Sequence, residues 1–339
     1  MIRRFLAAII IVGAAAALLV IGWPSLFGVA QAPIVAQIVS LRALTSALAI
    51  GAALTLALMA VLWATARTFL AALALLAVLF AALNVAVLST RGFGDDSFPT
   101  RAPAELAVLT WNTLGDAPGV ERIAELVLAE QADIVVLPET SQETAVAIAE
   151  RTRLDGRPMW VYSIAFDYVA KARSTSVLVS VDLGEYIVDD SVGNTSVLPS
   201  IVLTPVDGTG PTIIGVHPVA PIPGELENWR TDLQWVDDVC RGNNVIMAGD
   251  VNATPDHFRV VDAEAGPAGL GFGDCLNAGL VTGNGAVGTW PARLPPLLGA
   301  PIDHIFVTPD ITVTGFRVIT TEDGSGSDHR PIVARLILE

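Results

Sequence analysis

The first 89 residues contain no Asp, Glu or Lys, and this absence of charge limits what they can fold into. Their only charged side chains are four arginines, Arg3, Arg4, Arg42 and Arg67. Three apolar runs span about residues 5–22, 44–64 and 68–88. A helix needs about 20 apolar residues to cross the roughly 30 Å hydrocarbon core of a bilayer. The pattern therefore predicts three transmembrane helices, since a cleaved signal peptide could account for the first run alone.

The arginines predict how these helices are oriented. Arg3 and Arg4 precede the first run, and Arg67 lies in the short link between the second and third runs. Basic residues near helix ends favour the cytoplasmic side. Three crossings then place everything after residue 88 outside the cytoplasm. We expect a multi-pass protein of the cell membrane with an extracytoplasmic C-terminal domain.

The rest of the chain has a different composition. All 34 acidic residues lie beyond residue 89, together with 15 of the 19 basic residues, so this part carries a formal charge of −19. Lys171 is the only lysine. Non-specific nucleic-acid binding depends mainly on Lys and Arg, so the composition disfavours it. A nuclease is still possible, because a bound metal can reverse the charge locally.

Residues 90–103 are rich in turn formers and are predicted to be a linker. A single domain is expected over residues 104–339, which is long enough for one large core. Cys240 and Cys275 both lie in it, and their spacing matches no metal motif. In an oxidising compartment they could form a disulfide, and otherwise they would be two buried thiols.

Hydrophobic periodicity in this domain is typical of an α/β fold with many strands. Helical spacing is found in residues 120–130 and 226–239. Short apolar runs of strand type occupy residues 106–111, 133–137, 176–181, 200–204, 212–216, 244–248, 302–307, 311–319 and 331–338.

Polar residues follow four of these strands at the point where each strand ends. They are Asn112, Glu139, His217 and Asp250. One such residue is explained by an ordinary turn, but four together indicate a functional site, because strand ends present side chains rigidly. Asp303, in Pro-Ile-Asp-His, and the pair Asp328-His329, in Ser-Asp-His-Arg-Pro, extend the set.

These segments resemble the endonuclease/exonuclease/phosphatase superfamily, which includes pancreatic-type deoxyribonucleases, abasic-site endonucleases, neutral sphingomyelinases and inositol polyphosphate phosphatases. The matching segments are residues 109–112, 133–139, 216–218, 248–255, 302–305 and 327–331, in the superfamily's order. Gly-Asp-Val-Asn-Ala-Thr-Pro and Ser-Asp-His-Arg-Pro are the most specific. The resemblance implies a four-layer α/β sandwich of two packed, mostly antiparallel sheets flanked by helices.

The resemblance also implies a role for each matching residue. Glu139 is expected to be the principal ligand of Mg²⁺ (or Mn²⁺), with Asn112 and Asp328 nearby. Asp250 would activate water. The remaining expected catalytic residues are Asn252, which would orient the water or the phosphate, His217 and His329, which would contact the phosphate, and Asp303, which would hold His329. The chemistry is consistent, because Mg²⁺ prefers carboxylate oxygens and neutralises a phosphoester's charge.

Four other features are interpreted from the sequence alone. His304 is expected to be structural, because it would point away from Asp303 on a regular strand. His257 is expected to be solvated. Trp290 could line a substrate surface or fix its own loop. Residues 266–288 hold eight glycines and are expected to form a mobile loop.

The first functional hypothesis is a membrane-anchored, metal-dependent phosphoesterase. It would hydrolyse a lipid-linked or small phosphoester at the extracytoplasmic face. An extracellular nuclease with the same site is the alternative, disfavoured by the missing basic patch. A non-catalytic binding protein of the same fold is the third hypothesis, and it would require a broken motif, which the sequence does not show.

Overall fold

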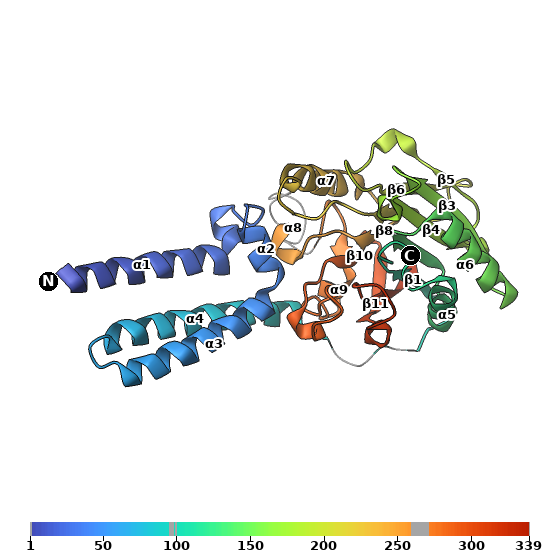
Figure 1. Cartoon of the computed structure of the whole chain (residues 1–339). Helices are drawn as coiled ribbons and strands as arrows, with labels where there is room; N and C mark the ends of the chain where they lie inside the picture. Colours follow the sequence, from blue (N-terminus) through green and yellow to red (C-terminus); the bar gives the residue numbers. More distant parts are fainter. Residues whose placement is uncertain (1, 95–97, 99, 259–270, 339) are drawn as a thin grey trace. The chain divides into compact units, whose positions relative to one another are not determined.

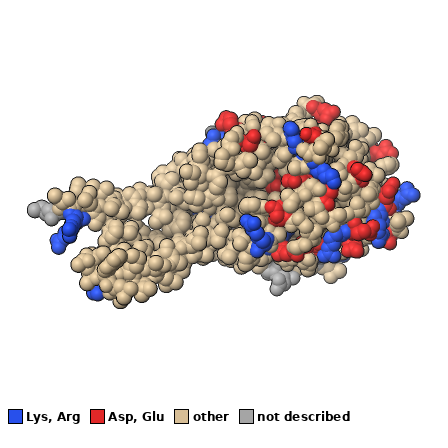
Figure 2. Space-filling view, in the orientation of Figure 1, with Lys and Arg blue, Asp and Glu red and all other residues tan. Residues whose placement is uncertain are grey.

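The structure is a computed structural model that describes residues 2–94, 98, 100–258 and 271–338. The chain forms two compact units, Met1–Arg91 and Gly92–Glu339. The charged side chains gather over the second unit, whereas the helices of the first are almost free of them (Figure 2).

The N-terminal unit contains three helices long and apolar enough to span a membrane, α1 (Ile2–Gly22), α3 (Arg42–Leu62) and α4 (Arg67–Arg91) (Figure 1). The shorter elements η1 (Pro24–Phe27) and α2 (Val35–Ser40) connect α1 to α3. Helices that expose apolar side chains on their outer faces are suited to lipid as the surrounding solvent.

A buried arginine joins these three helices. Arg42, the first residue of α3, donates from one guanidinium nitrogen to the carbonyl of Gly22, at 3.1 Å, and to Asn84 Oδ1 on α4, at 2.5 Å. Arg42 and Asn84 are both buried. The cation thus satisfies a terminal carbonyl of α1, where the helix dipole is negative. Arg42 therefore packs inside the helical unit instead of lying in a solvated link.

The C-terminal unit contains two six-stranded mixed sheets. The first has the order β11-β12-β1-β2-β4-β3, with β1 at Leu106–Thr110, β2 at Ile134–Pro138, β3 at Met159–Ala165, β4 at Ser174–Ser180, β11 at Ile311–Val318 and β12 at Ile332–Leu338. The second has the order β5-β6-β7-β8-β10-β9, with β5 at Tyr186–Val188, β6 at Ile201–Pro205, β7 at Thr212–Val216, β8 at Val245–Asp250, β9 at Leu276–Asn277 and β10 at Asp303–Val307. Among the described strands, only β1–β2 and β7–β8 are parallel pairs.

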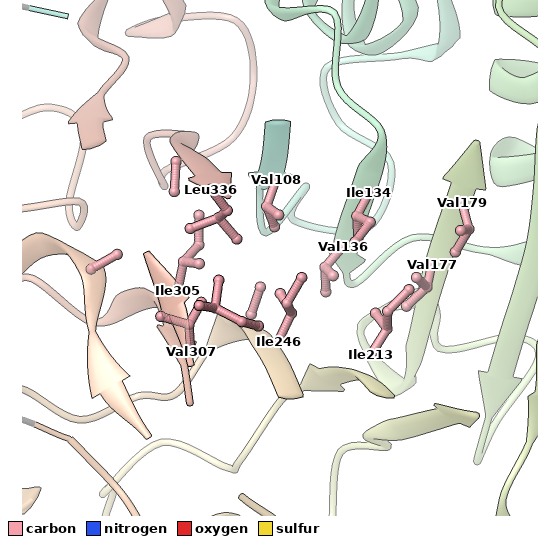
Figure 3. Packing of buried hydrophobic residues seen from close by; sticks show 14 of the residues in the cluster. Val108, Ile134, Val136, Val177, Val179, Ile213, Ile246, Ile305, Val307 and Leu336 are labelled. Atoms are coloured by element: carbon pink, nitrogen blue, oxygen red, sulfur yellow. The ribbon is translucent and has the colours of Figure 1, made fainter. Parts of the chain in front are cut away.

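The main core lies between the two sheets. Val108 and Val136 of the first sheet face Ile246 and Ile305 of the second (Figure 3). Their neighbours along the strands point the opposite way, since side chains alternate across a strand. Leu109, for example, belongs to the separate cluster on the outer face of the first sheet.

Helices cover the outer faces and complete four layers. Helices α5 (Val120–Glu130) and α6 (Gln142–Leu154) pack on the first sheet. Helices α7 (Leu226–Val239) and α8 (Pro255–Phe258) lie on the other side of the unit (Figure 1). The predicted α/β sandwich of two packed sheets flanked by helices is confirmed.

The structure departs from the sequence analysis at several elements. Elements α6, β3, β5 and β9 were not predicted from the sequence. Residues 271–288 were expected to be mobile, but they contain β9 and α9 (Ala278–Val281), while residues 266–270 lie outside the described part. His257 was expected to be solvated, which is wrong. It is fully buried and packs edge-on against Trp229.

Candidate active site

The predicted site residues come together because the two parallel strand pairs end side by side. Asn112 lies two residues beyond β1, and Glu139 directly follows β2. His217 directly follows β7, and Asp250 is the last residue of β8. Carboxyl ends of parallel neighbours share one edge of a sheet, and the packing of the two sheets brings both edges together. Asp303, at the start of β10, and Asp328 and His329, in the 327–329 loop, join these four residues.

Asp250 accepts several hydrogen bonds in a buried position. Its Oδ1 accepts from the backbone N–H of Asn252 at 2.9 Å. Its Oδ2 accepts from the side-chain amides of Asn112, at 3.0 Å, and Asn252, at 3.2 Å. Burial raises the pKa of the Asp250 carboxyl to about 7, although the nearby His329 opposes the shift. A carboxylate with a pKa near neutrality is well matched to accept a proton from water.

The backbone around the site is unusual. Gly249 has φ of 149°, and a Cβ there would lie 2.0 Å from the Val216 carbonyl oxygen, so only glycine allows β7 and β8 to approach so closely. Glu139 and Asn252 have φ of 57° and 50°, in the left-handed region. Such conformations cost on the order of 1 kcal/mol or more in non-glycine residues and cluster at functional sites.

His329 and Asp303 form a buried pair. His329 Nδ1 lies 2.9 Å from Asp303 Oδ2, and its Nε2 lies 3.8 Å from Asp250 Oδ2. Burial lowers the pKa of His329, but the carboxylates of Asp303 and Asp250 outweigh burial and raise it to about 10. Asp303 also lies directly opposite Asp250 in the β8–β10 register. The ring is therefore held as a cation between two carboxylates.

The side chain of Asn112 connects the carboxylates of Glu139 and Asp250. Its side-chain nitrogen donates to Glu139 Oε1 at 3.1 Å as well as to Asp250, while its Oδ1 accepts from the Leu114 N–H at 3.0 Å. The amide nitrogen, and not the oxygen, therefore faces the site. Burial raises the pKa of Glu139, against the opposing effects of Asn112 and His329.

Three side chains of the site, those of His217, Asp328 and Asp303, present buried atoms without a hydrogen-bond partner among the described residues. Neither ring nitrogen of the buried His217 has a hydrogen-bond partner among the described residues, and its Nε2 lies 3.9 Å from Glu139 Oε1. Burial lowers the pKa of His217 to about 3, so this ring is neutral. Asp328 accepts from Trp290 Nε1 at 2.9 Å through Oδ2, while its Oδ1 has no hydrogen-bond partner in the described part of the chain and lies 3.9 Å from His329 Nε2. Trp290 thus fixes one oxygen of Asp328 and leaves the other available.

The donor set fits a hard divalent cation. Glu139, Asp250, Asp303 and Asp328 supply four carboxyl groups, and the cationic His329 can balance only part of their charge. Oxygen donors of this kind suit Mg²⁺ or Mn²⁺. Asp250, Asp303 and His329 offer ligand-type atoms within 4.8 Å of one another, but a protonated His329 ring has no lone pair for a metal ion, so only the two carboxylates of this trio can bind one. The trio differs from the expected ligands Glu139, Asn112 and Asp328.

His304 and Arg330 form hydrogen bonds that hold the segments around the site in place. His304 Nε2 lies 2.8 Å from the Ala253 carbonyl, and its Nδ1 lies 2.8 Å from Asn277 Nδ2, in line with the expected structural role. Arg330 is fully buried and was given no role in the sequence analysis. It donates to Asp323 and to the carbonyls of Gly288, Ala292 and Leu294. One guanidinium therefore joins the loop of Trp290 to the loop of Asp328. Its only sequence signal was its place in Ser-Asp-His-Arg-Pro.

Comparison with known proteins identifies the family. A sequence model of the Endonuclease/Exonuclease/phosphatase family matches residues 109–329. The chain belongs to this family, whose members are phosphoric ester hydrolases. No curated protein sequence matches the chain.

Solved structures of similar fold include several members of the same family. An endonuclease/exonuclease/phosphatase from Beutenbergia cavernae is 19% identical with a TM-score of 0.48, covering 69% of this chain and 72% of that one. The mannosyl-6-phosphatase of Bacteroides thetaiotaomicron is 19% identical with a TM-score of 0.49, over 69% and 100%. TDP2 of D. rerio, solved with a single-strand DNA product, is 15% identical with a TM-score of 0.49, over 69% and 99%.

Proposed function

We propose that the protein is a membrane-anchored, Mg²⁺- or Mn²⁺-dependent phosphoester hydrolase. The observation that carries the proposal is the buried pairing of Asp250, whose pKa is about 7, with the His329–Asp303 pair beside Glu139. This arrangement holds a proton acceptor, a fixed cation and surplus carboxylates at one point. Water activation and stabilisation of a phosphoryl transition state need these three elements.

Each residue then has a defined task in the proposed reaction. A bound divalent cation, held by Glu139 and Asp328, would neutralise the phosphate charge and polarise phosphorus. Asp250 accepts a proton from the attacking water, and the Asn252 N–H keeps that carboxylate oriented. Asn112 acts as a donor that fixes two carboxylates.

The two histidines act on the phosphate. His329, held as a cation by Asp303, stabilises charge on the phosphoryl oxygens or protonates the leaving oxygen. His217 is neutral and buried, and its free ring nitrogens provide a hydrogen bond to the phosphate.

A lipid-linked or small phosphoester is the proposed substrate class. The three membrane-length helices and the excess of acidic residues support it, because an acidic domain repels polyanions such as nucleic acid. A nuclease that uses the same site is the second candidate. The two candidate functions differ in how much negative charge the substrate carries into the acidic domain.

A substrate panel on the full chain in nanodiscs tests this function. It compares bis-p-nitrophenyl phosphate, p-nitrophenyl phosphate, phospholipid, plasmid DNA and RNA. We expect hydrolysis of a non-nucleic-acid phosphoester, abolished by EDTA and restored by Mg²⁺ or Mn²⁺. Faster turnover of DNA or RNA at physiological salt would favour the nuclease. No metal-dependent hydrolysis of any substrate would disprove the enzymatic proposal.

We also propose that the C-terminal unit is extracytoplasmic and contains a disulfide. Cys240 and Cys275 are adjacent, with Cα atoms 5.9 Å apart, and they are separated by 35 residues in the sequence. A bond that closes a loop of this length is worth about 4 kcal/mol in the chain-entropy description. Disulfides of this kind persist outside the reducing cytoplasm.

Thiol labelling of protein taken directly from cell membranes tests this location. We expect that denaturation without reductant leaves both cysteines unmodified by maleimide, and that reduction exposes both. The double variant Cys240→Ser/Cys275→Ser should unfold at a lower temperature. Labelling of both thiols without reductant would contradict the disulfide and remove its support for the extracytoplasmic side.

A further inference from the structure

The loop between β3 and β4 presents an apolar tip, residues 166–169, to solvent. Val169 is 91% exposed and Tyr168 is 86% exposed, the two highest values among large apolar side chains in the described C-terminal unit. Phe166 is 40% exposed. Single exposed apolar residues are ordinary, but adjacent ones on a projecting loop mark a contact surface.

The tip is a structured turn that holds these side chains outward. Asp167 Oδ1 accepts from the N–H groups of Val169, at 2.8 Å, and Ala170, at 3.2 Å. The Phe166 N–H donates to the Arg173 carbonyl at 2.9 Å and closes the loop. The exposure of the tip is therefore part of the folded structure.

The base of the loop is attached to the active site. The Glu139 N–H donates to the carbonyl of Ser174, the first residue after the loop, at 2.9 Å. Lys171 forms an ion pair with Asp116 at 3.0 Å, and a Cβ at Gly115 would lie 3.6 Å from the Lys171 Cβ. The loop thus touches the segment that follows Asn112. The apolar tip belongs to the same edge of the unit as the proposed metal-binding and catalytic residues.

The composition of the loop suits the surface of a bilayer. Tyr168 and Val169 are followed by Ala170, Lys171, Ala172 and Arg173, in a unit where acidic residues outnumber basic ones, and the half-exposed Lys171 is paired with Asp116. Tyrosine favours the boundary between headgroups and acyl chains, and neighbouring basic residues favour anionic lipid. The chain also supplies the bilayer, because this unit begins one residue after the membrane-length helix α4 ends. A unit of this size has a diameter of roughly 45 Å, so the tether keeps lipid at a high effective concentration.

We propose that the apolar tip inserts into the lipid surface in which the chain's own helices are embedded, so that the active site takes the phosphoester of a membrane lipid directly from the bilayer. This inference rests on the proposed hydrolase function and specifies its substrate. If the tip instead bound a second copy of this chain or another protein, the activity and spin-label experiments below would give different results.

The first experiment compares two substrates on the full chain in nanodiscs of phosphatidylcholine and phosphatidylglycerol. The double variant Tyr168→Ser/Val169→Ser should hydrolyse the phospholipid at least tenfold more slowly. Its hydrolysis of soluble bis-p-nitrophenyl phosphate should stay within twofold of wild type. The control, Leu154→Ser, removes another highly exposed apolar side chain, 80% exposed at the end of α6, and should change neither rate.

The second experiment is independent of activity. A nitroxide attached to Tyr168→Cys in the same nanodiscs should be more accessible to oxygen than to a water-soluble nickel relaxer, and a label at Leu154→Cys should show the reverse. A water-exposed label at residue 168 would overturn the proposal, as would equal loss of both activities in the double variant. If wild type hydrolyses neither substrate, the hydrolase function fails, and the label still decides whether the tip meets lipid.

Discussion

Asp250→Asn is expected to reduce kcat by about 10²- to 10⁴-fold, the usual contribution of a general base. The amide has nearly the same shape as the carboxylate but cannot take a proton from water. Asp250 accepts hydrogen bonds from Asn112 and Asn252, and its Oδ2 lies 3.8 Å from His329 Nε2. Steady-state hydrolysis of whichever phosphoester wild type cleaves, measured with saturating metal, gives the comparison.

The same substitution should leave the fold intact. Burial disfavours the charged form of Asp250, but the asparagine nitrogen would face N–H donors that now bind a carboxylate oxygen, so the two effects oppose each other. We expect an unfolding temperature close to that of wild type. The matched control is Asp207→Asn, on the exposed turn after β6, which should retain full activity. Activity of Asp250→Asn within tenfold of wild type would exclude Asp250 as the base.

The sequence was sufficient to single out the candidate site residues because their signals are local. Asn112, Glu139, His217 and Asp250 each stand at the end of an apolar run, and a run of five residues specifies a strand end well. Nine of the twelve described strands follow from the same runs, whereas the arrangement in two sheets was implied by the family resemblance. What the runs do not encode is which strands are neighbours. The parallel pairing of β1 with β2 and of β7 with β8 brings the four residues together.

Elements whose buried and exposed sides differ little in hydrophobicity were not predicted. Helix α6 buries Ala145, Ile148, Ala149 and Thr152, a face made mostly of small residues that scarcely differs from its exposed side. Its start at the cap residue Ser141 was the available signal. Strand β3 is an edge strand and only half-buried, so its pattern lacks the strong alternation of the core strands.

Partners distant in the sequence could not be predicted at all. Arg330 is separated by 36 or more residues from the carbonyls of Gly288, Ala292 and Leu294 that it binds. The ring of His257 is enclosed by Trp229 from a different helix. Burial of a polar side chain depends on such long-range packing, so the position of His257 just after Pro255 suggested a solvated histidine. The same limit applies to the side-chain nitrogen of Asn112, which donates to Glu139 and Asp250, 27 and 138 residues away.

Asp303→Asn is expected to lower kcat by about 10²- to 10⁴-fold with a smaller effect on KM, because Asp303 acts on the reacting phosphate only through His329. Asp303 Oδ2 lies 2.9 Å from His329 Nδ1, and its carboxylate is a main cause of the raised pKa of that ring. An amide in its place supplies no negative charge and can present an N–H to Nδ1, which favours the wrong tautomer. The measurement is kcat and KM for the phosphoester that wild type hydrolyses. Asp310→Asn, just beyond the far end of β10, is the matched control and should retain wild-type rates.

A double-mutant cycle separates this positioning role from a general structural one. If Asp303 works through His329, then Asp303→Asn should cost little more once His329→Gln has already removed the ring, because two residues that act as a unit are strongly non-additive. Independent losses that multiply in the double variant would show that Asp303 has a separate task. Asp303 Oδ1, which has no hydrogen-bond partner among the described residues, identifies that task as metal binding. In that case Asp303→Asn should weaken Mn²⁺ binding in the His329→Gln background as well, whereas a pure positioning role leaves Mn²⁺ affinity there unchanged.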